Sequence, residues 1–412
     1  MRQSKFKFSL TFLIFLITNL YLISQETEKN PFSFKWDNGF KVESKDKKFK
    51  LKFGGRIMID HAYFKQDEAL DMSYGPLEST TGTEFRRLRF FFSGTIYNNV
   101  EFKLNVDFAG GEARLKDAYI GVKKIPIVGT IRVGHVKEPH RFDALSSSKY
   151  FTFMERAIPA DFGNERNNGI LLMNDFLDKK LSIQTGVFRN ADAFGNDESA
   201  DNDVAWTSRI TSLVINKEDK EQLLHLGASY SHRKPDREEY KISIRPKSHL
   251  SRKYITTGNI PGVETTQVIN LEAAYSHGPF SIQAEYMNLG VDQNYEGIST
   301  KYNFKNYYAQ ASYFITKEHR PFINSYETFG RLKPKNNVFN GEKGAGAWEV
   351  ALRYTNTDLN SKDIYGGEQE DITLGLNWYL NPATRIMLNQ VWTHFPGEGN
   401  LLIFEMRFQI DF

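Results

Sequence analysis

The final residues of the chain alternate strictly between apolar and polar side chains, and this alternation limits what the chain can fold into. Apolar side chains stand at every second position: Leu402, Phe404, Met406, Phe408, Ile410 and Phe412. Glu405, Arg407 and Asp411 stand between them. A period of two places the two sets on opposite faces of a β-strand. We expect one face to meet lipid and the other a watery lumen, with Phe412 ending the last strand of a barrel.

The same alternation recurs along the chain. In residues 100–108, Val100, Phe102 and Leu104 share one face, and Glu101 and Lys103 share the other. Further segments with this pattern are 51–63, 87–97, 127–135, 206–215, 269–276, 280–289, 307–315, 348–355 and 372–380. Helical spacing fits none of them as well, and alternating segments of about ten residues are typical of a membrane barrel. The fold class predicted is all-β, a transmembrane antiparallel β-barrel.

Composition agrees with a barrel that encloses water. Hydrophobic residues make up 40% and charged residues 25%, and no internal run could form a spanning helix. A barrel with a lumen has this composition because only half of each strand faces lipid. Cysteine is absent, which excludes disulfides, thiolate metal sites and an amino terminus anchored by a lipidated Cys. The net charge of +3 favours no particular partner, and no nucleic acid is expected.

The first 24 residues resemble a secretory signal. Arg2, Lys5 and Lys7 supply the positive start, and residues 10–23 supply the apolar core. We expect cleavage near Ser24, which would leave residues 25–412 as a single outer-membrane barrel domain. A retained amino-terminal anchor is the alternative.

Turn residues divide the strands into short and long connections. Short ones fall at 98–99, 123–126, 178–179, 278–279 and 381–382, and long ones at 65–82, 136–165, 190–202, 234–263, 290–301 and 357–370. Periplasmic turns and extracellular loops alternate in this way, which gives about 16 strands. Residues 317–345 break the pattern, because they form a long connection where a short turn is expected. Residues 238–244 leave open an extra hairpin arm inside the loop at 234–263.

Parity assigns the lumen side of each strand once the apolar face is given to lipid. The inward basic set is Lys52, Arg56, Arg87, Arg89, Lys103, Arg132, Arg209, Arg353 and Arg407, and the inward acidic set is Glu101, Asp107, Asp117, Glu272, Glu285, Glu349 and Glu405. This is a mixed lining, so any preference for anions must arise at the narrowest section. The basic connections 137–168, 233–253 and 331–343 are candidates for it, with a helix expected at 146–157. The alternative is that these cations are solvated extracellular charge.

Several stretches resemble the phosphate-selective porins of the O/P type. They are EFRRLR at 84–89, KDAYIG at 116–121, RVGHVKEP at 132–139, SSKY at 147–150, FMERA at 153–157, RPKSHL at 245–250, FGRLKPK at 329–335, GAWE at 346–349 and GLNWYLNP at 375–382. KDAYIG and RVGHVKEP resemble a hairpin of that family, and SSKY and FMERA resemble its constriction loop. Residues 245–250 resemble its second inward loop, and residues 329–349 its inward-folding periplasmic turn.

The resemblance implies a homotrimeric channel in the cell outer membrane with inward-folding loops that constrict each pore. Arginines would guide anions to a lysine-flanked constriction. By motif position and strand parity, the anion-binding and pore-lining residues expected are Arg87, Arg89, Lys103, Arg132, Lys137, Arg245, Arg252, Lys333 and Lys335. Parity places Arg86 on the lipid side, where its side chain would snorkel to the interface.

The function expected is passive diffusion of anions, with phosphate or polyphosphate as the solute. A general diffusion porin without phosphate preference and a non-conducting structural barrel remain open as alternatives. An enzyme is not expected, because no Gly-x-Ser-x-Gly motif is present. His135 and His140 do not have a usual metal-ligand spacing, so neither a metal nor a cofactor is predicted.

Overall fold

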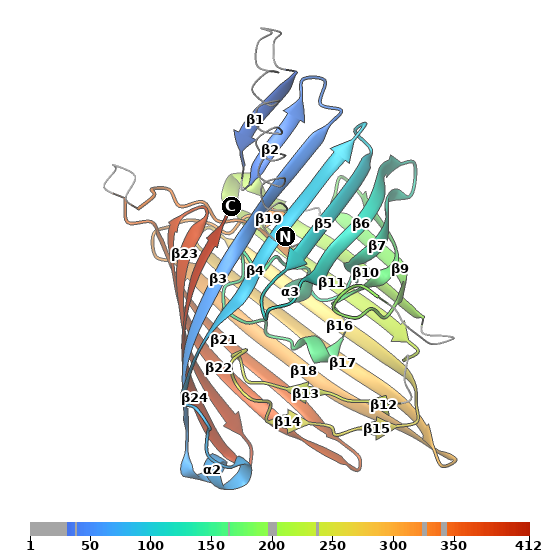
Figure 1. Ribbon diagram of the computed structural model, residues 1–412, viewed down its shortest axis with the longest axis vertical. Coiled ribbons are helices and arrows are strands. Elements are labelled where there is room, and N and C mark those ends of the chain that lie inside the picture. The colour runs from blue at the N-terminus through green and yellow to red at the C-terminus, as the bar shows by residue number, and fades with distance from the viewer. Residues whose placement is uncertain are drawn as a thin grey trace, which may run out of the picture.

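The chain forms one closed barrel of antiparallel strands (Figure 1). The computed structural model describes residues 31–37, 39–163, 165–196, 204–235, 239–323, 328–338 and 344–412. The predicted signal peptide lies outside these ranges. The sixteen barrel strands are β3 (Lys50–Gln66), β4 (Thr81–Ile96), β5 (Val100–Asp107), β6 (Arg114–Ile125), β7 (Gly129–Lys137), β8 (Arg166–Phe176), β9 (Leu181–Arg189), β10 (Ala205–Lys217), β11 (Gln222–Arg233), β16 (Val263–His277), β17 (Phe280–Tyr295), β18 (Ile298–Phe314), β21 (Ala347–Ser361), β22 (Ile364–Asn381), β23 (Thr384–Phe395) and β24 (Gly399–Asp411). The predicted fold class and strand number are therefore confirmed.

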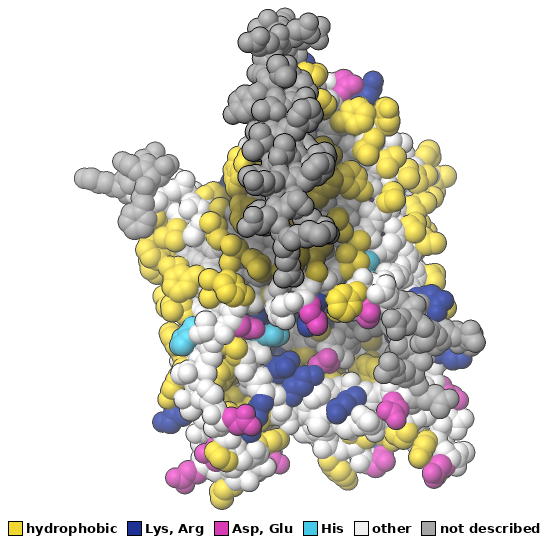
Figure 2. Space-filling model, viewed as in Figure 1, with side chains coloured by type: hydrophobic (Ala, Val, Ile, Leu, Met, Phe, Trp, Pro, Cys, Tyr) yellow, Lys and Arg dark blue, Asp and Glu magenta, His cyan; other side chains and the backbone are white. Residues whose placement is uncertain are grey.

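Each strand presents alternate residues to the two sides of the wall. On β24, Phe404 and Phe408 are exposed on the outside, whereas Glu405 and Arg407 are buried on the inside. Apolar side chains cover the upper flanks of the barrel, and charged side chains gather toward its lower end (Figure 2). Among the described residues, no helix combines the length and apolar character needed to cross a membrane.

The five predicted short connections are turns, and they lie at the periplasmic end by the usual rule for such barrels. The prediction of long connections at 290–301 and 357–370 is wrong, because both connections are short. β17 continues to Tyr295 and β18 begins at Ile298, and β21 reaches Ser361 with β22 beginning at Ile364. The strands continue past the apolar pattern because their polar side chains pair across the sheet. The Asp292 carboxylate, for example, accepts hydrogen bonds from the side chains of Thr265 (2.9 Å) and Gln267 (2.8 Å).

Four long connections contain short elements of their own. Between β7 and β8, residues 138–165 form what we call loop 138–165, with α3 (Phe142–Leu145) and η1 (Ala160–Phe162). The other short elements are α2 (Glu68–Tyr74), η2 (Glu218–Lys220), β12 (Glu239–Tyr240), β13 (Ser243–Ile244), β14 (Ile255–Thr256), β15 (Ile260–Pro261), β19 (Phe322–Ile323) and β20 (Thr328–Phe329). The extra hairpin arm near 238–244 exists as β12 and β13, which pair within their own loop rather than in the barrel wall.

The helix predicted at residues 146–157 is wrong. α3 ends at Leu145, and the following residues are irregular. Side chains of the barrel wall take the backbone carbonyls that a helix would use. Arg385 donates to the Phe151 carbonyl (2.6 Å) and Asn377 to the Thr152 carbonyl (2.8 Å). These wall contacts outweigh a weak local helix preference.

The barrel closes where β24 meets β3, beside two glycines. The Gly55 N–H donates to the Phe412 carbonyl at 2.6 Å, and the Phe412 N–H donates to the Gly55 carbonyl at 3.1 Å. A Cβ added at Gly55 would lie 2.5 Å from the Arg89 carbonyl oxygen and 2.8 Å from the Phe412 ring. Closure therefore requires a residue without a side chain at this position.

We expect Gly55→Ala to destabilise the closed barrel by about 1–3 kcal/mol, because a methyl group would force the last strand away from the first. The stability would be measured by urea unfolding of the refolded protein, followed by its mobility on an unheated gel. Gly290→Ala is the control, since its Cβ would meet no atom closer than 3.6 Å. Equal unfolding midpoints for the two variants would contradict this account of closure.

Candidate functional site

A large cavity in the barrel is bounded by strands β3 to β9 on one side and by loop 138–165 on the other. Its volume is about 1100 Å³. Fourteen basic side chains line it: Lys41, Lys50, Lys52, Arg56, Arg89, Lys103, Lys123, Lys124, Arg132, Lys137, Lys149, Arg156, Arg166 and Lys179. Only Glu101, Asp117 and Asp175 supply acidic groups to the same lining. The cavity is therefore strongly basic, although the whole chain is close to neutral.

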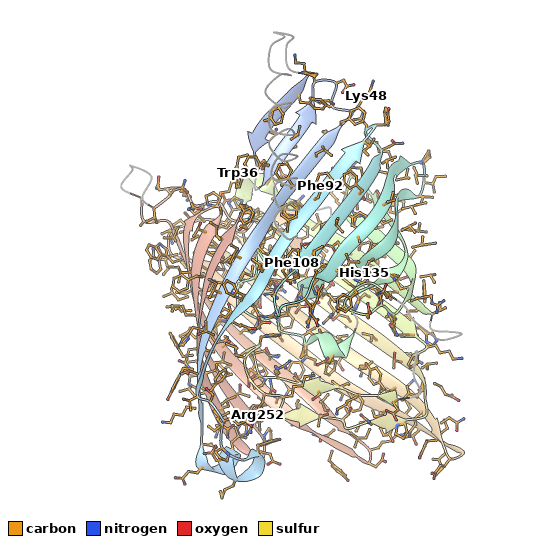
Figure 3. All side chains as sticks on the ribbon, in the orientation of Figure 1. Trp36, Lys48, Phe92, Phe108, His135 and Arg252 are labelled. Carbon is orange, nitrogen blue, oxygen red and sulfur yellow. The ribbon has the colours of Figure 1, made fainter. Side chains whose placement is uncertain are left out.

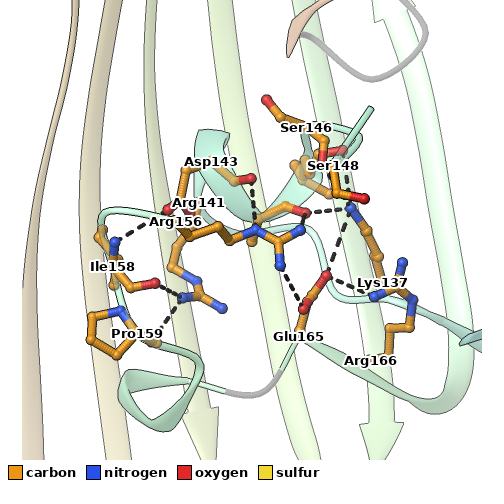
Figure 4. Close-up of polar contacts among 12 residues, drawn as sticks. Lys137, Arg141, Asp143, Ser146, Ser148, Arg156, Ile158, Pro159, Glu165 and Arg166 are labelled. Carbon is orange, nitrogen blue, oxygen red and sulfur yellow. Dashed lines mark hydrogen bonds and ion pairs between the residues drawn. The ribbon is translucent and has the colours of Figure 1, made fainter. Parts of the chain in front are cut away.

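Loop 138–165 is held in the lumen by a network at its base (Figure 4). The Lys137 ammonium donates to the carbonyls of Ala144, Leu145 (3.2 Å) and Ser146 (3.3 Å), at the end of α3. Arg156 donates to the Glu165 carboxylate at 2.9 Å. A cation facing the last carbonyls of a helix is favourable, although α3 is short.

The opposite wall of the barrel holds the same loop through arginines. Arg353 donates to the Glu155 carbonyl at 2.8 Å, and its guanidinium lies 4.4 Å from the centre of the Phe153 ring. Arg407 donates to the Met154 carbonyl (2.6 Å) and makes two 2.6 Å contacts with the Asp60 carboxylate. These cations face the lumen, but both are buried against the loop and not open to the cavity.

The cavity lining contains the predicted acids Glu101 and Asp117, but basic side chains predominate in it more than the predicted inward set indicates. The acids and several of the bases in the predicted lumen set neutralise each other within the barrel wall. Arg209, for instance, pairs with Glu272 at 2.5 Å with both side chains fully buried. Parity identified the inward face correctly for the residues of this set, but it could not show which inward groups are covered by the loop.

The connection at 315–346 also folds into the barrel, as the resemblance implied. Arg320 donates to the Tyr150 carbonyl at 3.3 Å and pairs with Glu349. The ring centres of Phe329 and Phe142 lie 5.6 Å apart. This periplasmic connection and loop 138–165 therefore meet inside the lumen and narrow it together.

Arg86 faces the lumen rather than lipid, so its predicted position is wrong. The pairing of β3 with β4 shifts register between Met58 and Ile59, which pair with Arg87 and Phe85. Arg86 is the extra residue of this bulge, and a bulge lets neighbouring side chains leave the strict alternation. Its guanidinium makes two hydrogen bonds to the Glu155 carboxylate, at 2.7 and 2.8 Å.

Four of the nine predicted site residues line the cavity. Arg89 pairs with Asp107 (2.6 Å), Lys103 with Asp117 (2.8 Å), and Arg132 with Glu101 (2.7 Å). Lys137, the fourth, lies at the loop base described above. Arg87 is only 3% exposed and lies under the loop, 6.0 Å from the centre of the Phe151 ring.

The other four predicted residues lie elsewhere. Arg245 is exposed on the loop between β11 and β16, and its Nε donates to the Ser251 carbonyl. Arg252 donates to the Tyr74 and Gly75 carbonyls (3.1 and 2.9 Å), which tethers the loop that carries α2. Lys333 and Lys335 are exposed on the connection at 315–346.

Sequence reasoning did not select the lysines at the periplasmic end of the cavity. Lys123 and Lys124 lie at the end of β6, Lys179 lies in the turn between β8 and β9, and Lys50 begins the first barrel strand. The sequence offered one signal for them: adjacent lysines at predicted turns, where Gly, Asn or Pro would suffice. Solvated turns carry lysine for many reasons, so the pattern alone would not have assigned them to the lining.

Sequence comparison identifies the family. Residues 52–412 match the family described as "Phosphate-selective porin O and P". The chain belongs to this family. Porin O of Pseudomonas aeruginosa is 27% identical over 396 residues, which cover 85% of this chain and 84% of that protein. An uncharacterized protein of Caulobacter vibrioides is also 27% identical, over 89% of this chain and 73% of that protein.

Solved porins share the fold. The anion-selective porin from Comamonas acidovorans superimposes with a TM-score of 0.56 at 13% identity, over 88% of this chain and all of that one. OprB of Pseudomonas putida gives 0.55 at 10% identity, over 88% and 94%. Membership of the porin O and P family makes this chain an anion-selective channel of the outer membrane.

Charges on loop 138–165 of this porin are strongly coupled to their neighbours. Burial opposes ionisation of Glu165, but Arg156 and Arg166 outweigh it and hold the pKa of that carboxyl well below its usual range. The pKa of Lys149, on the cavity side of the loop, is shifted toward the neutral form instead. Burial and the nearby Arg56 guanidinium lower the pKa of its ammonium to about 7, although Asp411 partly compensates. Lys149 therefore titrates near neutrality.

Arg86→Met is expected to destabilise the porin by about 2 kcal/mol, because Glu155 would lose a bidentate partner and keep only Arg407. Urea unfolding in lipid vesicles measures this difference. Arg86→Lys, which keeps the charge but loses the fork of donors, should lie between the two. An Arg facing lipid would give the opposite sign, since removing its charge would stabilise the barrel.

Anion selectivity should fall as pH rises from 6 to 8, because Lys149 loses its charge near pH 7. The reversal potential across a planar bilayer under a KCl gradient reports this change. Lys149→Arg should remove the pH step and keep the selectivity found at pH 6, and Lys149→Met should keep the selectivity found at pH 8. An unchanged pH step in Lys149→Met would show that another group titrates.

Proposed function

We propose that this porin conducts inorganic phosphate into the periplasm by passive diffusion. The basic wall of the cavity is the observation that carries the proposal. Its fourteen Lys and Arg side chains face only three acids. Such a wall lowers the energy of an anion inside a narrow, partly desolvated pore and raises that of a cation.

The kinds of cation present suit phosphate. Arg89, Arg132 and Arg166 offer planar forks of donors that match two phosphate oxygens, and Lys103 and Lys149 offer compact point charges. Several cations already have a carboxylate partner, such as Asp117, which contacts both Lys103 (2.8 Å) and Arg166 (3.0 Å). A phosphate ion would exchange with these partners instead of meeting bare charge. Each site would therefore bind weakly, which allows the ion to leave again.

The residues proposed to contact the passing anion differ in part from those expected from the motifs. Arg89, Lys103, Arg132 and Lys137 keep the role from the strand side. Arg56, Lys149, Arg156 and Arg166 join them around the loop. Arg245 is proposed as an entry contact because its side chain is exposed toward the extracellular end.

The remaining predicted residues receive different roles. Arg87 and Arg252 are proposed to hold the loops, since their guanidinium groups lie against protein groups. Lys335 donates to the Lys317 carbonyl at 2.6 Å, so it is proposed, with Lys333, to support the inward connection at the exit.

We also propose that the porin works as a homotrimer, reached by export with residues 1–24 as the signal. One solved neighbour, OmpT of Vibrio cholerae, is described in a trimer form, at 10% identity and a TM-score of 0.54. Outer-membrane lipid would surround the assembly, and small anions would be its solutes.

Phosphate should block chloride current through the porin, because phosphate binds the basic wall more tightly and moves more slowly. The block would be titrated in planar bilayers. Lys103→Met should weaken it on the order of fivefold, which corresponds to about 1 kcal/mol. The variant is expected to fold, because Asp117 keeps Arg166 and Asn105 as partners.

Lys301→Met is a matched control for this measurement. Lys301 also pairs with an Asp on a strand, Asp292 at 3.4 Å, but it is exposed on the outer surface near the extracellular end. Its loss should leave the block unchanged. A chloride current indifferent to phosphate in the native porin would establish a general diffusion porin, and absence of current would establish a structural barrel.

A further inference from the structure

A two-stranded hairpin precedes the part of the chain that matches the family. β1 (Phe32–Trp36) pairs with β2 (Phe40–Ser44), and β2 pairs with residues 50–53 of β3. β24 pairs with β3 only from Arg56 onward. The hairpin therefore takes the place beside β3 that β24 leaves free, and it extends the wall beyond the closed barrel (Figure 1).

One face of this hairpin is apolar. The cross-strand pairs Trp36 with Phe40 and Phe40 with Phe53 put these three rings on one side. Their centres lie 5.1 Å and 5.3 Å apart. Phe34, on the same face, is 68% exposed, and Trp36 and Phe40 are each 52% exposed. Rings of this size are rarely left in water in such a row.

The other face of the hairpin is charged. Lys35 pairs across the strands with Lys41, and Lys41 with Lys52. Lys41 and Lys52 line the basic cavity, and Glu43 contacts Lys50 at 2.9 Å. Alternation along each strand thus directs the lysines to the mouth of the pore and the aromatic rings away from it.

The apolar face continues the lipid-facing wall without interruption. Phe53 of β3 is paired with Phe92 of β4, and Phe92 with Leu104 of β5. Trp36 and Phe92 both lie toward the periplasmic end (Figure 3). Phe92 and Leu104 are exposed on the outside of the barrel, where the membrane is. The hairpin therefore continues the apolar outer face of the barrel wall.

We propose that this face of the β1–β2 hairpin is a membrane-contact surface that lies in the headgroup region of the periplasmic leaflet. Trp and Phe rings favour that zone, because it accepts their apolar area. β1 is the last strand of the extension, and its outer backbone groups need water, which headgroups provide and hydrocarbon does not. The phospholipid surface would hold the hairpin so that its lysines remain over the pore exit.

Spin labels on adjacent residues of β1 test this proposal directly. The chain has no cysteine, so Phe34→Cys and Lys35→Cys each give a single labelling site. The labelled porin would be placed in vesicles of phosphatidylethanolamine and phosphatidylglycerol. The label at 34 should be relaxed by oxygen, which concentrates in lipid, and shielded from a water-soluble nickel complex. The label at 35 should show the reverse, although it is only one residue away.

Two outcomes would overturn the proposal. Equal access of the nickel complex to both labels would place the hairpin in water. Shielding of the label at 34 from both relaxing agents, with spin–spin broadening that disappears on dilution with unlabelled chains, would place it between copies of the porin. Migration on an unheated gel verifies that each variant has a closed barrel before labelling.

Discussion

Hydrogen bonds from wall arginines to the backbone of loop 138–165 are the interaction on which the channel depends. An irregular segment inside a barrel has carbonyl groups that neither a helix nor a sheet satisfies, and leaving them buried and unpaired is costly. Arg353, Arg385 and Arg407 supply the missing donors. The loop can therefore remain non-helical and still be fixed, which sets where the cavity lies and which side chains face it.

These contacts also explain how a nearly neutral protein encloses a basic channel. Two acids of the loop are paired within the protein: Glu155 contacts Arg86 and Arg407 of the wall, and Glu165 contacts Arg156 of the loop and Arg166 of β8. Lys149 and Arg156 of the loop, with basic side chains of the facing strands, line the cavity. Acidic side chains of the loop are thus paired within the protein, whereas basic side chains line the cavity. The net charge of the chain therefore gives no indication of selectivity.

The sequence predicted the barrel because period-two alternation is a local property of each strand, and β24 follows it residue by residue. Arg86 departed from the prediction because a bulge depends on the register with β3, which one strand does not encode. The irregular course of residues 146–157 depends on donors more than 200 positions away, such as Arg385 to the Phe151 carbonyl. Parity found the inward cations, but only the folded loop decides which of them meet solvent.

The pairing of Arg56 with Asp411 and of Gly55 with Phe412 joins the two ends of the barrel sequence. This contact joins residues that are almost as far apart in sequence as the chain allows. Closing so long a loop costs chain entropy, so we expect the contact to form late in folding. Until the last strand arrives, β3 has a free edge and the lumen is open to the side. The β1–β2 hairpin pairs with residues 50–53 of the same β3 edge, close to it in sequence, and so shortens the free edge that the C-terminal strand has to find.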